Sequence, residues 1–175
     1  DVQQDSLYYV IRAWGEYETS WLIRYGQVLD FESLQEVASM TYRCKDGKQL
    51  RVTHGFIDSG FRTDEVYRFC EKYGWAPCKG IDSSIQTSPY RWANVSTAAP
   101  SAIQIKTDYF KDFLQLKLKI SQDDPGAWLL HRETEYAYGR HLAAEAAVEQ
   151  KDKFGRIKRV YKRYDRENHW LDCEV

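Results

Sequence analysis

The sequence predicts an α/β fold in which helices flank a mixed β-sheet. A length of 175 residues is typical of one domain with its own hydrophobic core. Residues 7–14 and 19–29 are rich in β-forming residues and are separated by a short turn, which predicts an antiparallel hairpin. After residue 29, strand-forming and helix-forming segments alternate to the C-terminus, a pattern typical of α/β domains.

The N-terminal half is predicted to add two helices and two strands to this hairpin. Residues 1–3 are interpreted as the end of a strand whose body lies upstream. Asp30 is a suitable N-cap for the first helix, Thr63 is predicted to cap the second helix, and Gly74 is predicted to close it. The expected elements are residues 30–40 (helix), 49–58 (strand), 63–74 (helix) and 75–80 (strand).

The C-terminal half is predicted to begin with a long loop and to end with an additional β-hairpin and a helix. Residues 81–101 are rich in Ser, Thr, Pro and Ala, and a loop of this length is usually functional or mobile. The hairpin is predicted to turn at Phe154 and Gly155. The expected elements are residues 102–105 (strand), 107–118 (helix), 128–131 (strand), 135–147 (helix), 148–164 (hairpin) and 168–173 (helix).

Charge, cysteines and motifs exclude several classes of protein. The formal net charge is −1, so overall charge indicates no partner. The four cysteines show no C-x-x-C pair and no histidine spacing typical of zinc sites, which fits a reducing compartment without a disulfide framework. No signal peptide or long apolar run is present, so the sequence predicts neither secretion nor a membrane span. No phosphate-binding loop of a nucleotide-hydrolysing motor and no serine-hydrolase elbow occurs.

Three acids lie at the ends of predicted elements. Asp58 ends an apolar segment and is followed by Ser59-Gly60, so its carboxylate is expected to be accessible, although Asp-Ser-Gly is also ordinary turn chemistry. Asp1 and Asp172 also lie at the ends of predicted elements, Asp1 at the end of the first strand and Asp172 near the end of the last helix. Carboxylate oxygens suit Mg²⁺ or Mn²⁺, and two such ions can hold the attacking and leaving oxygens of a phosphodiester. With 26 acids in the chain, this spacing alone selects no unique trio.

Basic residues concentrate in one segment of this otherwise neutral chain. Residues 151–166 hold eight Lys and Arg against two Asp, which indicates either an acidic partner such as nucleic acid or the solvated face of a hairpin. Lys79, before Gly80, and Lys106, before a predicted helix start, are candidate phosphate contacts. Surface lysine is the alternative interpretation for both.

Several motifs occur in a fixed order from one end of the chain to the other. They are Asp1-Val2-Gln3, Arg12-Ala13-Trp14-Gly15 with Glu18 and Ser20-Trp21, Ile57-Asp58-Ser59-Gly60, Val66-Tyr67 with Phe69, Lys79-Gly80, Lys106, and Asn168-His169-Trp170-Leu171-Asp172-Cys173. This series resembles the C-terminal endonuclease domain of the lambda-like (GpA-type) terminase large subunit of tailed phages. The resemblance covers essentially the whole chain.

The resemblance implies an RNase H-like fold and a nuclease with two divalent ions, Mg²⁺ or Mn²⁺, that cuts concatemeric double-stranded viral DNA during genome packaging. It places Asp1, Asp58 and Asp172 at the catalytic and metal-binding acid positions. The DNA-binding residues expected with them are Lys79, Lys106, Arg156, Lys158 and Arg159.

The resemblance also implies partners and a location. Residues 1–175 are expected to be a single nuclease domain, a fragment of a larger chain whose ATPase motor is absent, with its first strand cut at Asp1 and its last helix ending soon after Asp172. In the full-length protein the small terminase subunit and the portal are the expected partners, in the host cell cytoplasm. The sequence leaves two alternative functions open. One is another RNase H-like nuclease of the resolvase or transposase type, and the other is a non-catalytic DNA- or protein-binding module.

Overall fold

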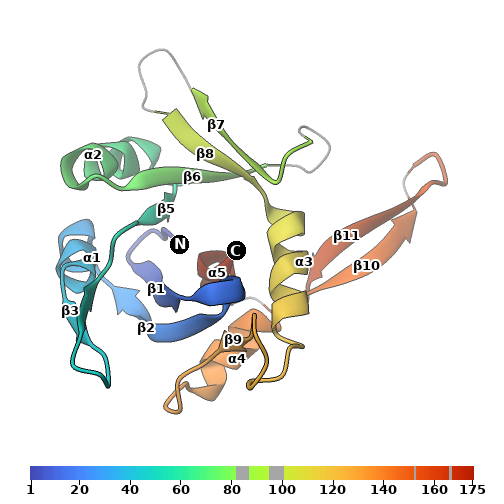
Figure 1. Ribbon diagram of the computed structural model, residues 1–175. Coiled ribbons are helices and arrows are strands. Elements are labelled where there is room, and N and C mark those ends of the chain that lie inside the picture. The colour runs from blue at the N-terminus through green and yellow to red at the C-terminus, as the bar shows by residue number, and fades with distance from the viewer. Residues whose placement is uncertain (82–86, 95–100, 152, 166) are drawn as a thin grey trace.

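The computed structural model covers residues 1–175 and describes all of them except residues 82–86, 95–100, 152 and 166 (Figure 1). The described residues form a mixed α/β fold in which helices flank several β-sheets. The predicted α/β class is therefore confirmed. No helix within the described ranges is long and apolar enough to cross a membrane.

The predicted N-terminal hairpin is present as the core of a three-stranded sheet. Strand β1 (Leu7–Trp14) pairs antiparallel with β2 (Ser20–Val28), and a short 3-10 turn (Glu16–Glu18) lies between them. The register shifts between Ile11 and Arg12, which is a β-bulge. Strand β9 (Trp128–Leu129) adds to this sheet parallel to β2.

A second sheet has four strands in the order β5-β6-β8-β7. Strands β5 (Phe56–Asp58), β6 (Ala76–Ile81) and β8 (Ser101–Lys106) run parallel, and β7 (Tyr90–Asn94) pairs antiparallel with β8. The prediction of a loop over residues 81–101 is therefore wrong at β7, because pairing with β8 orders a segment whose surroundings are rich in Ser and Pro. The remainder of that prediction lies partly outside the described residues.

The single strand predicted over residues 49–58 is also wrong. Its first part, β4 (Gln49–Arg51), pairs instead with β3 (Thr41–Arg43) in a small separate hairpin, and only its last residues form β5. Between the two, a Cβ atom on Gly55 would lie only 2.4 Å from the Trp75 ring. A glycine is therefore needed where the backbone passes Trp75, and the chain leaves one sheet for another there.

The first hydrophobic core lies beneath helices α1 (Phe31–Ala38) and α2 (Thr63–Tyr73). The predicted cap of α1 is confirmed, because the Asp30 carboxylate accepts a hydrogen bond from the Ser33 backbone N–H at 2.8 Å. Thr63 is the first residue of α2 rather than its cap, and its hydroxyl donates to the Ser59 carbonyl at 2.9 Å. The core residues are Val2, Leu7, Phe31, Leu34, Ile57, Val66, Phe69 and Cys70.

The second core lies on the other face of the β1–β2 sheet. It is covered by α3 (Thr107–Lys117), α4 (Tyr136–Leu142) and α5 (His169–Glu174). Since side chains alternate along a strand, β1 sends Leu7 and Tyr9 to the first core and Val10 to the second. The second core consists of Leu22, Leu114, Trp128, Tyr138, Leu142 and Leu171.

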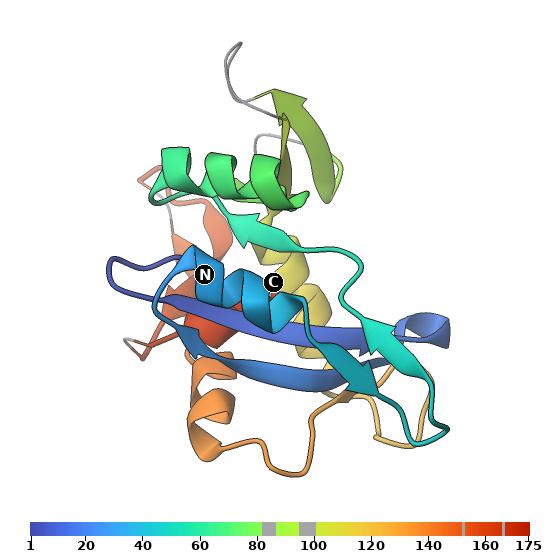
Figure 2. The same cartoon turned by 90° about the vertical axis from the view of Figure 1, so that its left-hand side faces the viewer.

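The additional β-hairpin near the C-terminus is confirmed. Strand β10 (Glu145–Lys151) pairs antiparallel with β11 (Ile157–Arg163). The hairpin projects from the body of the molecule beside α3, on the side opposite α1 and α2 (Figures 1 and 2). Helix α4 is shorter than the predicted 135–147, because the residues after Ala144 pair as a strand.

The single mixed sheet expected from the sequence is replaced by separate sheets in the described residues. Strand β1 is an edge strand of the three-stranded sheet, and β5 is an edge strand of the four-stranded sheet. Among the described residues, no β-ladder joins these two strands. The chain nevertheless keeps helices on both sides of its sheets. The RNase H-like arrangement itself stays a prediction.

Candidate active site around helix α5 and the end of strand β5

Asp58 lies at the end of β5, where the following turn is firmly held. Ser59 is 2% exposed, and both its hydroxyl and its backbone N–H donate to the Cys78 carbonyl of the neighbouring strand, at 2.9 and 2.8 Å. The Gly60 N–H donates to the Asp58 carboxylate at 3.0 Å. Burial, followed by the charge of Asp58, raises the pKa of Cys78 to about 11. Asp58 is therefore a half-buried carboxylate fixed at a strand end.

Asp1 lies against the last helix of the chain. Its carboxylate accepts hydrogen bonds from the Gln3 side-chain amide at 2.9 and 3.0 Å and lies 2.7 Å from His169 Nδ1. Burial lowers the pKa of His169. Nδ1 donates to the Asp1 carboxylate both in the neutral ring that carries its proton on Nδ1 and in the charged ring. The Asp1 amino group lies 3.3 Å from Cys173 Sγ. Asp1 is thus held by residues on both sides of Asp172 in the sequence.

Asp172 projects from α5 between those two contacts. The side chain reaches solvent, but crowding by protein atoms on its inner side desolvates the carboxylate and raises its pKa. Lys111 acts in the opposite direction, and Glu145 adds to the increase. The Asp1 carboxylate and Asp172 therefore both lie at α5, and a site that they share stays a prediction.

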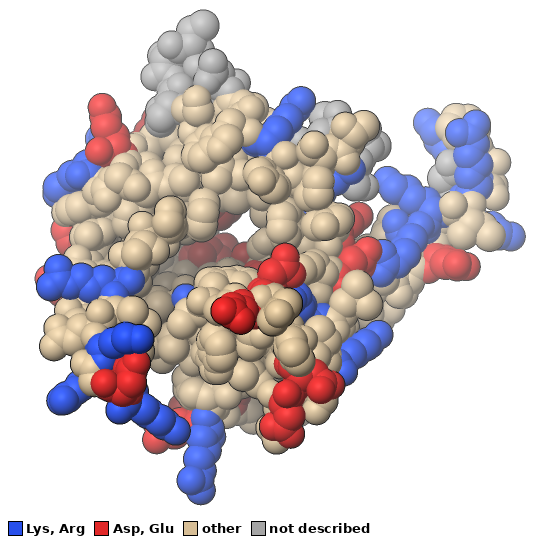
Figure 3. Space-filling view, in the orientation of Figure 1, with Lys and Arg blue, Asp and Glu red and all other residues tan. Residues whose placement is uncertain are grey.

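One face of the molecule carries a hollow. Figure 3 shows this hollow in the middle of the face, below β6 and β8 and beside α3, with acidic side chains at its depth. Within the described residues, no three His, Cys, Asp or Glu side chains form a group that can hold a metal ion, and no hydrogen bond joins Asp58 to Asp1 or Asp172. The carboxylate oxygens are nevertheless the donors that Mg²⁺ and Mn²⁺ prefer. A shared site for the three acids stays a prediction.

A buried ion pair anchors α5 to the first sheet. The Arg12 guanidinium on β1 donates to the Glu174 carboxylate at 2.6 and 2.8 Å, and the two side chains are 5% and 1% exposed. The Tyr138 hydroxyl of α4 also donates to Glu174. Arg12 further donates to Ser20 and stacks on Trp128 with its guanidinium carbon 4.0 Å from the ring centre. Neither Arg12 nor Glu174 has a role that could be predicted from the sequence.

A second network holds the start of α5. Glu145 on β10 accepts hydrogen bonds from Lys111 Nζ at 2.6 Å and from the Asn168 side-chain amide at 2.8 Å. Asn168 precedes the first residue of α5, so the network joins α3, the hairpin and α5. The structural role of Glu145 was not predicted, because the sequence pattern placed Glu145 in a helix. No local signal in the sequence marks Lys111 and Asn168 as its partners.

One of the predicted DNA contacts lines a second, smaller cavity, and two others are sequence neighbours of lining residues. The cavity has a volume of about 390 Å³ and lies between the end of β6, the start of α3 and β11. Lys158 lines it, and the exposed Lys79 and the half-buried Lys106 each precede a lining residue. Lys106 Nζ also donates to the Thr87 carbonyl at 3.2 Å. The lining residues are Gly80, Ile81, Thr107, Asp108, Lys158, Val160 and Tyr161.

Arg159 is bound within the protein. Its guanidinium donates to the two oxygens of Asp112 on α3 at 2.6 and 2.5 Å, and the Tyr161 hydroxyl donates to the same carboxylate. Hydrogen bonding from Arg159 lowers the pKa of Asp112, so the pair is charged at neutral pH. In this structure Arg159 orients the hairpin, and its contact with DNA stays a prediction. Arg156 is exposed near the tip.

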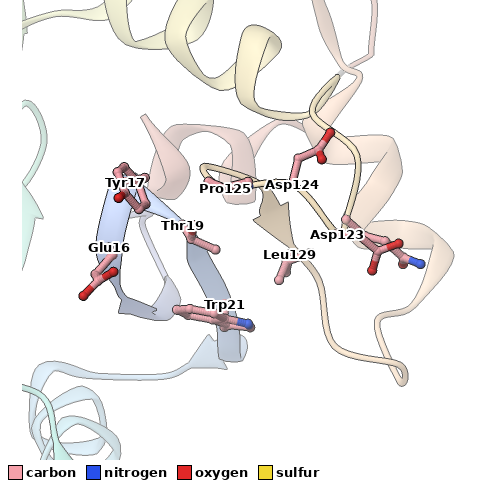
Figure 4. A pocket seen from close by; sticks show the side chains of 9 residues that line it. Glu16, Tyr17, Thr19, Trp21, Asp123, Asp124, Pro125 and Leu129 are labelled. Atoms are coloured by element: carbon pink, nitrogen blue, oxygen red, sulfur yellow. The ribbon is translucent and has the colours of Figure 1, made fainter.

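Another pocket, of about 580 Å³, is lined by none of the three candidate acids and none of the candidate DNA contacts (Figure 4). It is formed by the turn after β1 and the loop before β9. Its acidic side chains disfavour a phosphate backbone by charge. The lining residues are Glu16, Tyr17, Thr19, Trp21, Gln122, Asp123, Asp124, Pro125 and Leu129.

The described residues thus form an α/β domain with accessible carboxylates and a C-terminal hairpin rich in Lys and Arg. The sequence model of one family, described as terminase large subunit gpA, endonuclease domain, matches residues 1–175. The chain belongs to this family, which implies a nuclease that acts on DNA together with packaging machinery. Comparison with curated proteins and with solved structures gave no significant match.

Proposed function

We propose that this chain is a metal-dependent endonuclease that cuts concatemeric double-stranded viral DNA during genome packaging. Asp1, Asp58 and Asp172 would hold two divalent ions, Mg²⁺ or Mn²⁺. The observation that carries this proposal is the contact of the Asp1 carboxylate with His169 of α5, the helix that also carries Asp172, in a member of an endonuclease family. The accessible Asp58 at a strand end supplies the third carboxylate.

When bound, two such ions would activate a water molecule and stabilise the leaving oxygen of the phosphodiester. The protein's own groups would prepare the site. His169 orients the Asp1 carboxylate through its Nδ1 proton, and Lys111 opposes the increase in the pKa of Asp172, so that more of this carboxylate is ionised. Lys79, Lys106 and Lys158 would hold the DNA backbone at the smaller cavity without reading sequence.

In the full-length protein, the ATPase motor would move the DNA, and the small terminase subunit and the portal would be the partners. We place this reaction in the host cell cytoplasm. Membership in the family supports these proposals.

Cleavage of a supercoiled plasmid tests the proposed function. The chain should nick and linearise the plasmid in Mn²⁺ or Mg²⁺ and should leave it intact in EDTA. Asp58→Asn should abolish cleavage in both metals while the circular dichroism spectrum stays unchanged. Asp123→Asn is the matched control, because this exposed acid lines the pocket away from the hollow. A folded Asp58→Asn protein that cuts at the parent rate would overturn the assignment of Asp58.

Substrate choice separates the terminase function from that of a junction-resolving nuclease. A terminase nuclease should cut a linear duplex and a four-way junction at similar rates. A strong preference for the junction would favour a resolvase-type enzyme. Binding of DNA without cleavage in either metal, by a folded protein, would favour a binding module.

A further inference from the structure

The β10–β11 hairpin is held firmly at its base. The strands pair from Glu145 and Arg163 at the base to Lys151 and Ile157 near the tip. At the base, Glu145 is bound by Lys111. Further along, Arg159 and Tyr161 are bound by Asp112 of α3. These contacts fix the direction in which the outer part of the hairpin projects (Figures 1 and 2).

The tip combines an exposed aromatic ring with cations. Phe154 is 73% exposed, although burying such a side chain is worth about 1.5–3 kcal/mol. Lys153 Nζ lies 5.1 Å and the Arg156 guanidinium carbon 5.8 Å from the centre of its ring. Gly155 has a φ of +77°, which brings Arg156 back beside the ring in a tight turn. Ile157, the first residue of β11, is 65% exposed next to this tip.

An exposed aromatic ring flanked by two cations is better suited to contact with a DNA duplex than to exposure to water. Proteins that deform DNA insert apolar side chains between base steps while neighbouring cations neutralise phosphates. At the tip, Lys153 and Arg156 stand on either side of Phe154 in the sequence, so a contact of both cations with phosphates would direct the ring toward the bases.

We propose that Phe154 is an apolar wedge that partly unstacks one base step of the duplex substrate, while Lys153 and Arg156 contact the flanking phosphates. This assignment rests on the proposed DNA substrate and extends it from backbone binding to duplex deformation. The hairpin would then place a local distortion at a fixed position relative to the acids, because α3 sets its direction.

Binding to a short duplex in EDTA tests the wedge without cleavage. A 2-aminopurine base in the duplex reports unstacking through an increase in fluorescence, and fluorescence anisotropy reports affinity. We expect Phe154→Ala to lose the fluorescence increase and to weaken binding roughly tenfold, since stacking on one base is worth about 1–3 kcal/mol. The dependence of affinity on salt should stay unchanged, because no charge is removed. Phe154→Trp should keep both signals.

Two controls separate the ring from the charges. Tyr136→Ala removes an aromatic side chain that is 84% exposed on α4, outside the hairpin, and should bind like the parent. The double variant Lys153→Ala with Arg156→Ala should reduce the slope of log affinity against log salt by roughly 1.8, at about 0.9 for each phosphate contact.

The wedge is overturned if Phe154→Ala binds the duplex and increases 2-aminopurine fluorescence like the parent, in which case the exposed tip is better assigned to a protein partner. Plasmid cleavage by the same variant keeps the two proposals apart. Metal-dependent cutting with unaltered duplex binding would reject the wedge alone. A parent protein that increases the fluorescence but never cuts in Mn²⁺ would reject the nuclease function alone.

Discussion

At the scale of single residues, Asp172 has the most unusual electrostatic environment of the candidate acids. Desolvation raises its pKa, Lys111 opposes the increase, and Glu145 adds to it. A carboxyl group whose pKa is higher in the folded state stabilises the fold at low pH, and this contribution is lost as pH increases through the folded pKa. In the proposed metal site, the ionised Asp172 carboxylate would therefore be held at a cost in stability.

Asp172→Asn should separate activity from stability. The amide has no charge to desolvate, so we expect a melting temperature equal to or above that of the parent at pH 7, and no cleavage in Mn²⁺. Thermal unfolding and plasmid cleavage measure the two effects. A variant that unfolds at a clearly lower temperature would show that the carboxylate is structural, and a variant that still cuts would remove it from the site.

The pH dependence of cleavage should report the same group. Activity should increase with pH as Asp172 ionises, and Lys111→Met should shift this increase to higher pH because the cation that most lowers the pKa of Asp172 is lost. The logarithm of kcat/KM measured from pH 5 to pH 8 gives both curves. Lys119→Met, an exposed lysine just beyond α3, is the control and should leave the curve unchanged. Superimposable profiles for all three proteins would contradict a role of Lys111.

At the scale of elements, α5 depends on its anchors. The helix has six residues, which is too short to be stable alone in water. Its position is set by the buried pair of Arg12 with Glu174 and by the bond from Asn168 to Glu145. A helix fixed by long-range contacts at both ends presents Asp172 in one orientation.

Arg12→Leu should destabilise the fold by about 3–5 kcal/mol, because it leaves the Glu174 carboxylate buried without its charged partner. Urea unfolding measures this loss. The control is Lys48→Leu, which breaks an exposed pair with Asp46 and should change stability by less than about 1 kcal/mol. The double variant Arg12→Leu with Glu174→Leu should recover part of the lost stability. Equal effects of Arg12→Leu and Lys48→Leu would mean that the pair does not anchor α5.

Local signals predicted the elements that depend on local interactions. The cap at Asp30 and the closing Gly74, which has a φ of +73°, were identified from sequence because each acts within a few residues. The segments 49–58, 81–101 and 135–147 were misjudged in part, because distant strand pairing decides where β4, β7 and β10 form.

The residues of the candidate site also differ in whether local sequence or long-range contacts determine their role. Asp58 with its small neighbours is visible in the sequence, since accessibility at a strand end is a local property. The roles of Arg12 and Glu145 depend on partners that are 162 and 34 positions away in the chain. No periodicity or motif encodes such a pair, so these residues emerge only from the folded structure.

At the scale of the whole molecule, the β1–β2 sheet joins the two cores. One face contributes Leu7 to the first core, and the other contributes Leu22 to the second. A sheet shared in this way couples the two cores, so that neither can lose its packing alone. Separate sheets therefore do not imply separate folding units in this chain.

Urea unfolding should follow a single transition by tryptophan fluorescence and by far-UV circular dichroism. Leu7→Ala in the first core and Leu114→Ala in the second should each lower the free energy of unfolding by about 2–5 kcal/mol. Both variants should shift the two signals together. A variant in which one signal moves and the other does not would show that the cores unfold independently.

The long-range anchoring of α5 also has a consequence for when the enzyme becomes competent. Residues 169–174 follow every other described strand and helix in the sequence, yet they complete contacts with Asp1 and Arg12. During synthesis at about 5–20 residues per second, the earlier elements emerge from the ribosome first. A nascent chain thus carries Asp1 and Asp58 before it carries Asp172. Translation itself would delay nuclease activity until the last of the three acids has been made.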